Sequence, residues 1–176
     1  VLITGDISDD ASPESYALAR AELARFGLPL LVIPGNHDGR AALHAAFGDA
    51  AGPGGGAVAG PATGPGADGL LDWALDIAGA RIIGLDTLVE GQGGGRLRPE
   101  SLAFLVRSLP LKTDQACVVA LHHPPLRTGI AFMDAIGLEN AQALEAVLAA
   151  SAGPVLVVAG HVHGVYMGWL GPHPVI

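Results

Sequence analysis

The feature that most constrains the fold of this chain is a repeated pattern in which a short apolar run is followed directly by a polar cluster. The four clusters are Gly5-Asp6, Gly35-Asn36-His37-Asp38, His122-His123-Pro124-Pro125 and Gly160-His161-Val162-His163, and they follow the runs 1–4, 30–33, 117–121 and 155–159. Short runs rich in Val, Ile and Leu are typical of buried strands. Because ligands of open α/β sheets bind outside the carboxyl ends of strands, we expect the four clusters to meet at one rim.

The segments between these runs predict helices and further strands. Helix-start signals and helical spacing indicate helices over 13–26, 40–47, 99–109 and 140–150, and further strands are expected over 70–77, 81–85 and 165–170. This alternation, with a hairpin-like pair in the middle, predicts a layered α/β domain with mixed sheets. The glycine-rich stretch 52–69 and Gly93-Gly94-Gly95 are expected to be flexible surface loops, because neither resembles a phosphate-binding loop followed by a helix.

Composition excludes several classes of function. The net charge of −8 argues against a general nucleic-acid binder, although a small phosphorylated substrate stays compatible with it if cations are bound. No apolar stretch approaches the roughly 20 residues of a membrane-spanning helix. The single cysteine, Cys117, excludes an internal disulfide and is expected to be a buried hydrophobic residue. Cysteine poverty fits a reducing compartment, so we expect a cytoplasmic protein.

The residue types in the clusters suit a metal site. Aspartate, asparagine and histidine together bind divalent first-row metals such as Mn, Fe or Zn. In an extended segment, His161 and His163 would lie on one side and face a common centre, whereas in a tight turn they would point toward two neighbouring metals. Each cluster alone has an ordinary explanation as a turn, a helix cap or a rigid loop. The four together predict a metal site, whereas His44 and His173 are not expected to take part.

These residues resemble the calcineurin-like metallophosphoesterases. The family pattern runs Asp-x-His, Gly-Asp, Gly-Asn-His-Asp/Glu, a His before a proline-containing loop, and Gly-His-x-His, and the clusters above supply the last four motifs in order. The stretch 122–140 is similar to the branch of class III cyclic-nucleotide phosphodiesterases and glycerophosphodiesterases. The resemblance implies a four-layer αββα sandwich with mixed sheets, and two divalent metal ions at the strand ends.

The resemblance also implies roles for individual residues. Asp6 resembles the carboxylate that bridges both metals, and His163 resembles a ligand of the first metal. The residues that resemble ligands of the second metal are Asn36, His122 and His161. His37 resembles the histidine that contacts the phosphate and protonates the leaving group. Asp38 resembles the acid that orients His37, and His123 is a weaker candidate for contact with substrate.

The expected function is metal-dependent phosphodiester hydrolysis, with 3',5'-cyclic nucleotides such as cAMP as plausible substrates. A phosphomonoesterase or nucleotide pyrophosphatase on the same site, and a non-catalytic interaction scaffold, are the alternatives. Because the Asp-x-His motif is absent, we expect 1–176 to be one metallophosphoesterase domain that lacks its first strand and further sheet at its C-terminal end. Its first metal site would then be incomplete, which leaves open that the chain is inactive. No nucleic-acid or membrane partner is expected, and an oligomer is left open.

Overall fold

The computed structural model describes residues 1–48, 69–111 and 114–176. Most of the glycine-rich stretch 52–69 therefore lies outside the described residues. The strands are β1 (Leu2–Ile3), β2 (Leu31–Val32), β3 (Trp73–Ile77), β4 (Ala80–Gly84), β5 (Cys117–Leu121), β6 (Val155–Ala159), β7 (Gly168–Leu170) and β8 (His173–Val175). The helices are α1 (Pro13–Ala24), α2 (Arg40–Phe47), α3 (Pro99–Ser108), α4 (Ala131–Ala135) and α5 (Ala141–Leu148).

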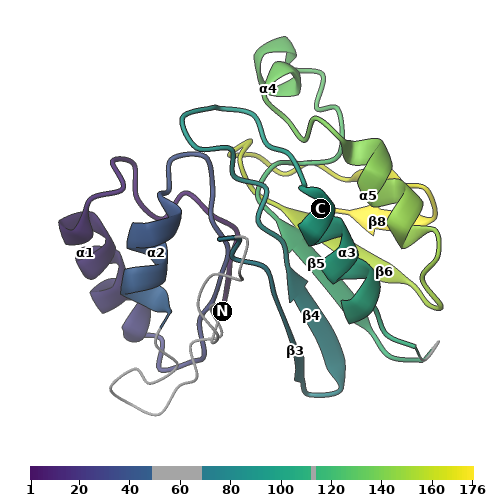
Figure 1. Cartoon of the computed structure of the whole chain (residues 1–176), viewed down its shortest axis with the longest axis horizontal. Coiled ribbons are helices and arrows are strands. Elements are labelled where there is room, and N and C mark those ends of the chain that lie inside the picture. Colours follow the sequence, from purple (N-terminus) through teal and green to yellow (C-terminus); the bar gives the residue numbers. More distant parts are fainter. Residues whose placement is uncertain (49–68, 112–113) are drawn as a thin grey trace.

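The strands form two sheets. β1 and β2 pair in parallel as a small sheet, with Leu2 opposite Leu31. The second sheet has six strands in the order β3-β4-β5-β6-β8-β7. Its central strands β4, β5, β6 and β8 are parallel, while β3 and β7 join the two edges in antiparallel pairings. The mixed sheet predicted from the sequence is confirmed, and Figure 1 shows α3 and α5 across one face of it.

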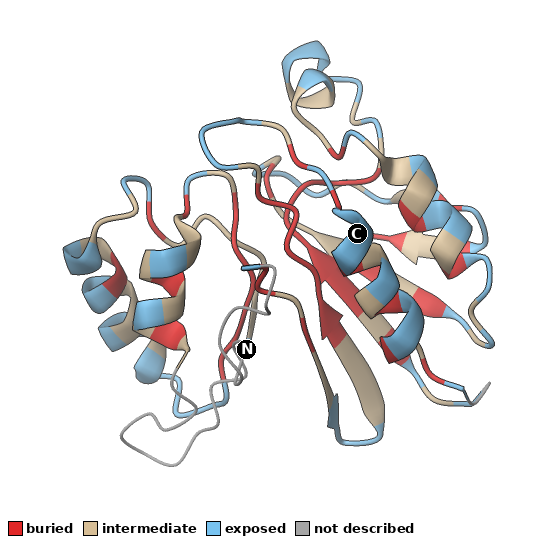
Figure 2. Ribbon diagram, viewed as in Figure 1, coloured by how far each residue is buried: buried red, intermediate tan, exposed pale blue. Residues whose placement is uncertain are grey.

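Three apolar clusters define four layers. Val32 of β2 packs with residues of α1 and α2, whereas its neighbours Leu31 and Ile33 pack against Trp73 and other residues of the large sheet. On the opposite face of that sheet, the buried side chains of β4, β5 and β6 pack against α3 and α5. Figure 2 shows these buried residues along the central strands and on the inner faces of the helices. The order of layers is therefore helix, sheet, sheet, helix, as the family resemblance implied.

The structure adds two short elements that the sequence did not predict. β8 contains His173 and Pro174, and its three residues pair with β6 and β7. Proline cannot donate to a ladder and weakens any strand signal, which explains why this strand was missed. α4 has five residues, too few to show helical periodicity. His173 is a satisfied core histidine: Nδ1 accepts a hydrogen bond from Val155 N, and Nε2 donates to the Leu148 carbonyl.

Within residues 1–48, 69–111 and 114–176, none of the helices has both the length and the apolar character needed to cross a bilayer.

Candidate metal centre

The polar clusters come together where β1, β2, β5 and β6 end. Asp6 follows β1, Asn36 follows β2, His122 follows β5 directly, and His161 comes two residues after β6. β1 and β2 are parallel to each other, and so are β5 and β6, so each pair delivers its loops at one edge. Figure 1 shows both sets of loops at the upper rim. The predicted convergence of the four clusters is confirmed for these four residues by the contacts that follow.

Asp6, Asn36, His122 and His161 form what we call the ligand cluster. The Asn36 side-chain oxygen lies 2.9 Å from His161 Nδ1 and 3.0 Å from His122 Nε2. The two imidazole nitrogens are 3.2 Å apart, and His122 Nε2 is 3.3 Å from Asp6 Oδ2. Three potential ligand atoms, from Asn36, His122 and His161, therefore lie within 3.2 Å of one another, and the Asp6 carboxylate adjoins them at His122.

The spacing and chemistry of the ligand cluster fit a divalent metal. Ligand bonds of about 2.1 Å place neighbouring ligand atoms about 3.0 Å apart in an octahedral shell and about 3.4 Å apart in a tetrahedral one. The Thr4 carbonyl can only accept, so His122 Nδ1, 2.6 Å away, carries the hydrogen and the lone pair of Nε2 faces the Asn36 oxygen. Two lone pairs at 3.0 Å repel each other unless a cation lies between them. Metal-binding histidines commonly donate their second N–H to a backbone carbonyl in this way.

Asp6 is held in its charged form. Burial raises the pKa of its carboxyl, but the contact with the His122 ring and the hydrogen bond from the backbone N–H of His37 outweigh burial and lower the pKa to about 2. The His37 N–H reaches Asp6 Oδ1 at 3.0 Å. Asp6 has a φ of 53°, and a β-carbon on Gly35 would lie 2.2 Å from its Oδ1. Only glycine at position 35 lets the two loops approach this closely.

His161 favours the neutral state that a metal ligand requires. Burial is the main cause that lowers the pKa of its imidazole, and the nearby His122 adds to this effect. Asp6 and the Ile136 carbonyl act in the opposite direction with less effect. The backbone of His161 has a φ of 72°, in the left-handed region that residues other than glycine rarely adopt. Such strain persists where the surrounding structure fixes a functional side chain.

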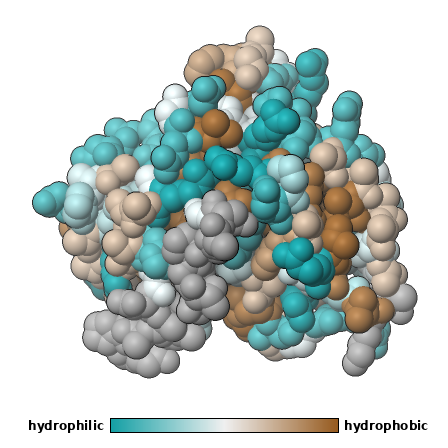
Figure 3. Space-filling view, viewed as in Figure 1, coloured by the Kyte–Doolittle hydropathy of each residue, from teal (hydrophilic) through white to brown (hydrophobic). Residues whose placement is uncertain are grey.

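His163 lies beside the ligand cluster on an open side of it. Its side chain is exposed and lines a cavity of about 280 Å³ together with Asp6, His122 and His161. The residue predicted for the first metal thus lines the same cavity as Asp6, the residue predicted to bridge both metals. Figure 3 shows hydrophilic residues in a band across the middle of the face viewed in Figure 1.

His37 stands at the edge of this site and contacts a residue that the sequence did not single out. Its Nδ1 lies 3.0 Å from Asp9 Oδ1, and about half of the His37 side chain is exposed. Because a carboxylate can only accept, Nδ1 bears the hydrogen of this contact and Nε2 remains for other partners. The structure brings His37 to the site through its backbone contact with Asp6, while its ring points toward Asp9.

Asp38 does not orient His37, and this expectation is corrected. The Asp38 side chain is buried and accepts hydrogen bonds from four donors at 2.8–3.1 Å, namely Gly35 N, Ile7 N, Ser8 N and Tyr16 Oη. Three backbone N–H groups and a phenol thus turn the carboxylate toward the interior. Asp38 ties the loop after β1 to the loop after β2, and Asp9 is the carboxylate partner of His37.

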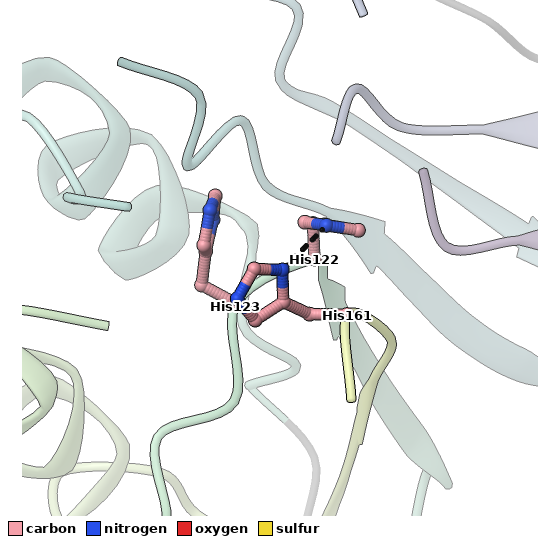
Figure 4. A group of neighbouring side chains, drawn as sticks. All are labelled: His122, His123 and His161. Atoms are coloured by element: carbon pink, nitrogen blue, oxygen red, sulfur yellow. Dashed lines mark hydrogen bonds between the residues drawn. The ribbon is translucent and has the colours of Figure 1, made fainter. Parts of the chain in front are cut away.

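The sequence suggested that His123 contacts substrate, whereas the structure places its side chain in the interior. It is fully buried, with Nδ1 2.8 Å from Thr87 Oγ1 and Nε2 3.2 Å from the Gly93 carbonyl. Burial, then repulsion from His122 and His161, lowers its pKa to about 3. Figure 4 shows the three imidazoles together, and one nitrogen of each lies within 4.8 Å of the others. With both nitrogens engaged, His123 stands behind the ligand cluster and is not one of its members.

Two elements of this site escaped the sequence analysis. Gly93-Gly94-Gly95 was expected to be a flexible loop, yet Gly95 is buried, donates to the Gly137 carbonyl and accepts from Glu139 N. Asp86-Thr87 follows the apolar run 82–85, which is the same pattern that marked the four clusters. Applying that pattern to a fifth strand would have found Thr87.

Comparison with known proteins agrees with this geometry. Residues 1–165 match the family described as calcineurin-like phosphoesterase. The chain is 33% identical over 168 residues to the glycerophosphodiester phosphodiesterase GpdQ of Enterobacter lignolyticus, covering 95% of this chain and 56% of that protein. It is 31% identical over 172 residues to the 3',5'-cyclic adenosine monophosphate phosphodiesterase CpdA of Pseudomonas aeruginosa, covering 98% and 57%. The chain therefore spans a little over half the length of these relatives.

A solved structure supports the fold. A crystal structure of a protein from Thermus thermophilus superimposes with a TM-score of 0.53 at 15% identity, covering 99% of this chain and 73% of the other. Similarity at this level of identity concerns the arrangement of layers and strands alone.

Proposed function

This chain belongs to the calcineurin-like phosphoesterase family, and from that premise we propose that it is a phosphodiesterase that requires divalent metal ions. The observation that carries the proposal is the cluster of Asn36 Oδ1, His122 Nε2 and His161 Nδ1 within 3.2 Å of one another, with Asp6 Oδ2 3.3 Å from His122 Nε2. We propose a small phosphodiester as the substrate, with 3',5'-cyclic nucleotides such as cAMP as candidates. The names of the relatives favour diesters over monoesters.

The ligand cluster would hold one metal, and Asp6 with His163 would contribute to a second position beside it. A divalent cation there would supply a Lewis acid that binds phosphate oxygens and activates water. The identity of the metals stays open among Mn, Fe and Zn, all of which accept carboxylate, amide and imidazole ligands. A cytoplasmic location also stays a prediction.

His37 is the residue that we propose for proton transfer. It is half exposed at the edge of the site, so a bound phosphodiester can reach its ring. With Nδ1–H on Asp9, an imidazolium form of His37 would give its Nε2 proton to the leaving oxygen and keep the Nδ1–H bond to Asp9. Asp6, whose carboxyl stays ionised because His122 and the His37 N–H contact it, contributes negative charge that favours cation binding.

The test is hydrolysis of bis(p-nitrophenyl) phosphate in the presence of Mn²⁺. We expect wild-type turnover to depend on Mn²⁺, and we expect Asn36→Ala to lose Mn²⁺ binding and turnover together. Asn140→Ala is a matched control, because Asn140 bonds the backbone of Leu97 and has no place in the ligand cluster. Unchanged turnover in Asn36→Ala would contradict the proposal. A panel of cAMP, a glycerophosphodiester and p-nitrophenyl phosphate then separates diesterase from monoesterase activity.

A further inference from the structure

Thr87 contacts His123 on both the backbone and the ring. Its hydroxyl lies 2.8 Å from His123 Nδ1 and accepts the backbone N–H of His123 at 3.5 Å. Both residues are fully buried, and Thr87 follows the end of β4 just as His123 follows the end of the adjacent β5. The two residues are therefore fixed by neighbouring parallel strands of the large sheet.

The contacts of His123 define its tautomer. The Gly93 carbonyl lies 3.2 Å from Nε2 and can only accept a hydrogen bond, so Nε2 carries the hydrogen. Nδ1 is then an acceptor, and the Thr87 hydroxyl is its donor. In the opposite tautomer, the lone pair of Nε2 would face the lone pairs of the Gly93 carbonyl. The structure thus favours one proton position and one orientation of the ring.

The loop Gly93-Gly94-Gly95 packs against the His123 ring at its Nδ1 atom. A β-carbon on Gly95 would lie 2.0 Å from His123 Nδ1, so the loop backbone occupies the space into which the ring could turn. The loop is itself held by hydrogen bonds from Gly95 N to Gly137 O and from Glu139 N to Gly95 O. Steric contact and hydrogen bonds together restrict His123 from the side away from the ligand cluster.

On its inner side, the His123 ring packs against two members of the ligand cluster. Its centroid lies 4.9 Å from that of His122 at an interplanar angle of 88°, and 4.8 Å from that of His161 at 49°. The centroids of His122 and His161 are 5.0 Å apart, so the three rings form a closed triangle. A change in the plane of the His123 ring would therefore alter its packing against His122 and His161.

We propose that Thr87 is a positioning residue for the metal centre, because its hydroxyl fixes the tautomer and orientation of His123 and thereby the ring positions of His122 and His161. This inference rests on the proposed function, since the ligand cluster is the same site. Residues that orient metal ligands from outside typically change metal affinity by about 10- to 100-fold when they are replaced. Loss of the Thr87 hydroxyl would also leave Nδ1 of His123 buried without a donor, which favours a turned ring.

The test combines two readouts on the 176-residue protein. Long-range ¹H–¹⁵N correlation spectra of the metal-free protein near pH 7 report which nitrogen of His123 carries the proton. Calorimetric titration with Mn²⁺ alone reports metal affinity. We expect the wild type to show a neutral His123 with the proton on Nε2. We expect Thr87→Val to lose that signature and to bind Mn²⁺ about 10-fold more weakly.

Two further variants separate the role of the hydroxyl from general stability. Thr87→Ser keeps the hydroxyl and should restore both the tautomer and the Mn²⁺ affinity. Ser101→Ala removes a buried hydroxyl from α3 that hydrogen-bonds no described residue, His123 included, and should change neither readout. If Thr87→Val does not fold, the wild-type spectrum and the Thr87→Ser titration still decide.

Several results would overturn the inference. These are a wild-type His123 protonated on Nδ1 or on both nitrogens, an unchanged Mn²⁺ affinity in Thr87→Val, or a Thr87→Ser variant as impaired as Thr87→Val. The spectrum of the metal-free protein does not depend on hydrolysis. If the wild type shows the expected spectrum but binds no Mn²⁺, the proposed function and the role of Thr87 in metal binding are both contradicted. The tautomer and orientation of His123 would still be confirmed.

Discussion

The guanidinium of Arg40 donates two hydrogen bonds to the carboxylate of Asp86, from Nε to Oδ2 at 2.6 Å and from Nη2 to Oδ1 at 2.9 Å. Arg40 begins α2, two residues after Asp38, and Asp86 follows β4 of the large sheet. Asp86 is fully buried and also accepts the backbone N–H groups of Leu71 and Leu88. This pair therefore joins the half of the fold that carries Asn36 to the half that carries His122.

Asp86→Asn should destabilise the protein by about 3 kcal/mol, because removing one partner leaves a largely buried guanidinium without its counter-charge. Urea unfolding followed by circular dichroism measures this loss. Asp76→Asn is the matched control, since Asp76 forms a similar two-bond pair with Arg81 but is half exposed. We expect the control to cost less than about 1 kcal/mol. Equal losses in the two variants would contradict a special role for the buried pair.

Asp38→Asn should reduce the free energy of unfolding by about 2 kcal/mol, because a neutral amide replaces a carboxylate that accepts four hydrogen bonds. Tyr16→Phe removes only the phenolic hydroxyl that contacts Asp38 and Gly39, and should cost about 1 kcal/mol. Both values come from denaturant titration. If Asp38 instead acted mainly by orienting His37, Asp38→Asn would lower activity with no loss of stability.

His37→Ala should lower kcat by about 100-fold or more, because the proposed proton donor is lost. Mn²⁺ affinity should stay close to that of the wild type, since alanine keeps the backbone N–H that holds Asp6. Steady-state kinetics with bis(p-nitrophenyl) phosphate and a parallel Mn²⁺ titration measure the two effects. Asp9→Asn, which weakens only the contact to the His37 ring, should show a smaller loss of kcat. A large loss of Mn²⁺ affinity in His37→Ala would assign His37 to metal binding.

Cys117 should resist alkylation in the native protein. It is buried in β5, as the sequence predicted, and burial raises the pKa of its thiol from 9.0 to about 11. Iodoacetamide at about pH 8 should therefore react at the rate at which the protein opens, and rapidly once urea unfolds it. Mass spectrometry of the modified fraction over time measures this. Rapid reaction below the unfolding midpoint would show that the interior face of β5 is accessible.

The same pKa shift predicts how stability depends on pH. Because the folded state holds the Cys117 proton more tightly than the unfolded state, this contribution to stability is full below about pH 9 and is lost as pH rises through about 11. Cys117→Ala should remove that part of the pH dependence. Denaturant midpoints recorded between about pH 8 and about pH 11 test the sign.

Much of the fold could be predicted because local signals were strong. Residues 117–121 and 155–159 are uninterrupted apolar runs, and both form strands with the predicted bounds. Ser12 caps α1 by accepting the N–H of Ser15, as its place before Pro13 indicated. The elements that were hard to predict have weak local signals, because their strand partners lie elsewhere in the chain. β8 depends on β6 and β7 for its hydrogen bonds and has little strand signal of its own.

The identities of the ligand residues were likewise visible in the sequence, whereas the surrounding contacts were not. Motif and strand position together indicated Asn36, His122 and His161, and the structure brings all three together with Asp6. Asp38 was assigned to His37 because the family resemblance implies an acid at this position that orients the histidine. The backbone direction of two loops decided instead that Asp38 faces inward and Asp9 contacts His37.

The sequence by itself determined which residues could bind a metal and at which strand ends they would lie, because side-chain chemistry and apolar patterning are local properties. Only the tertiary structure decided that Thr87 and Gly93 set the tautomer of His123, and that Arg40 and Asp86 join the two halves of the site. These contacts link residues 30 to 46 positions apart. Their hydrogen-bond geometry depends on the packing of whole strands and loops, which no short stretch of sequence specifies.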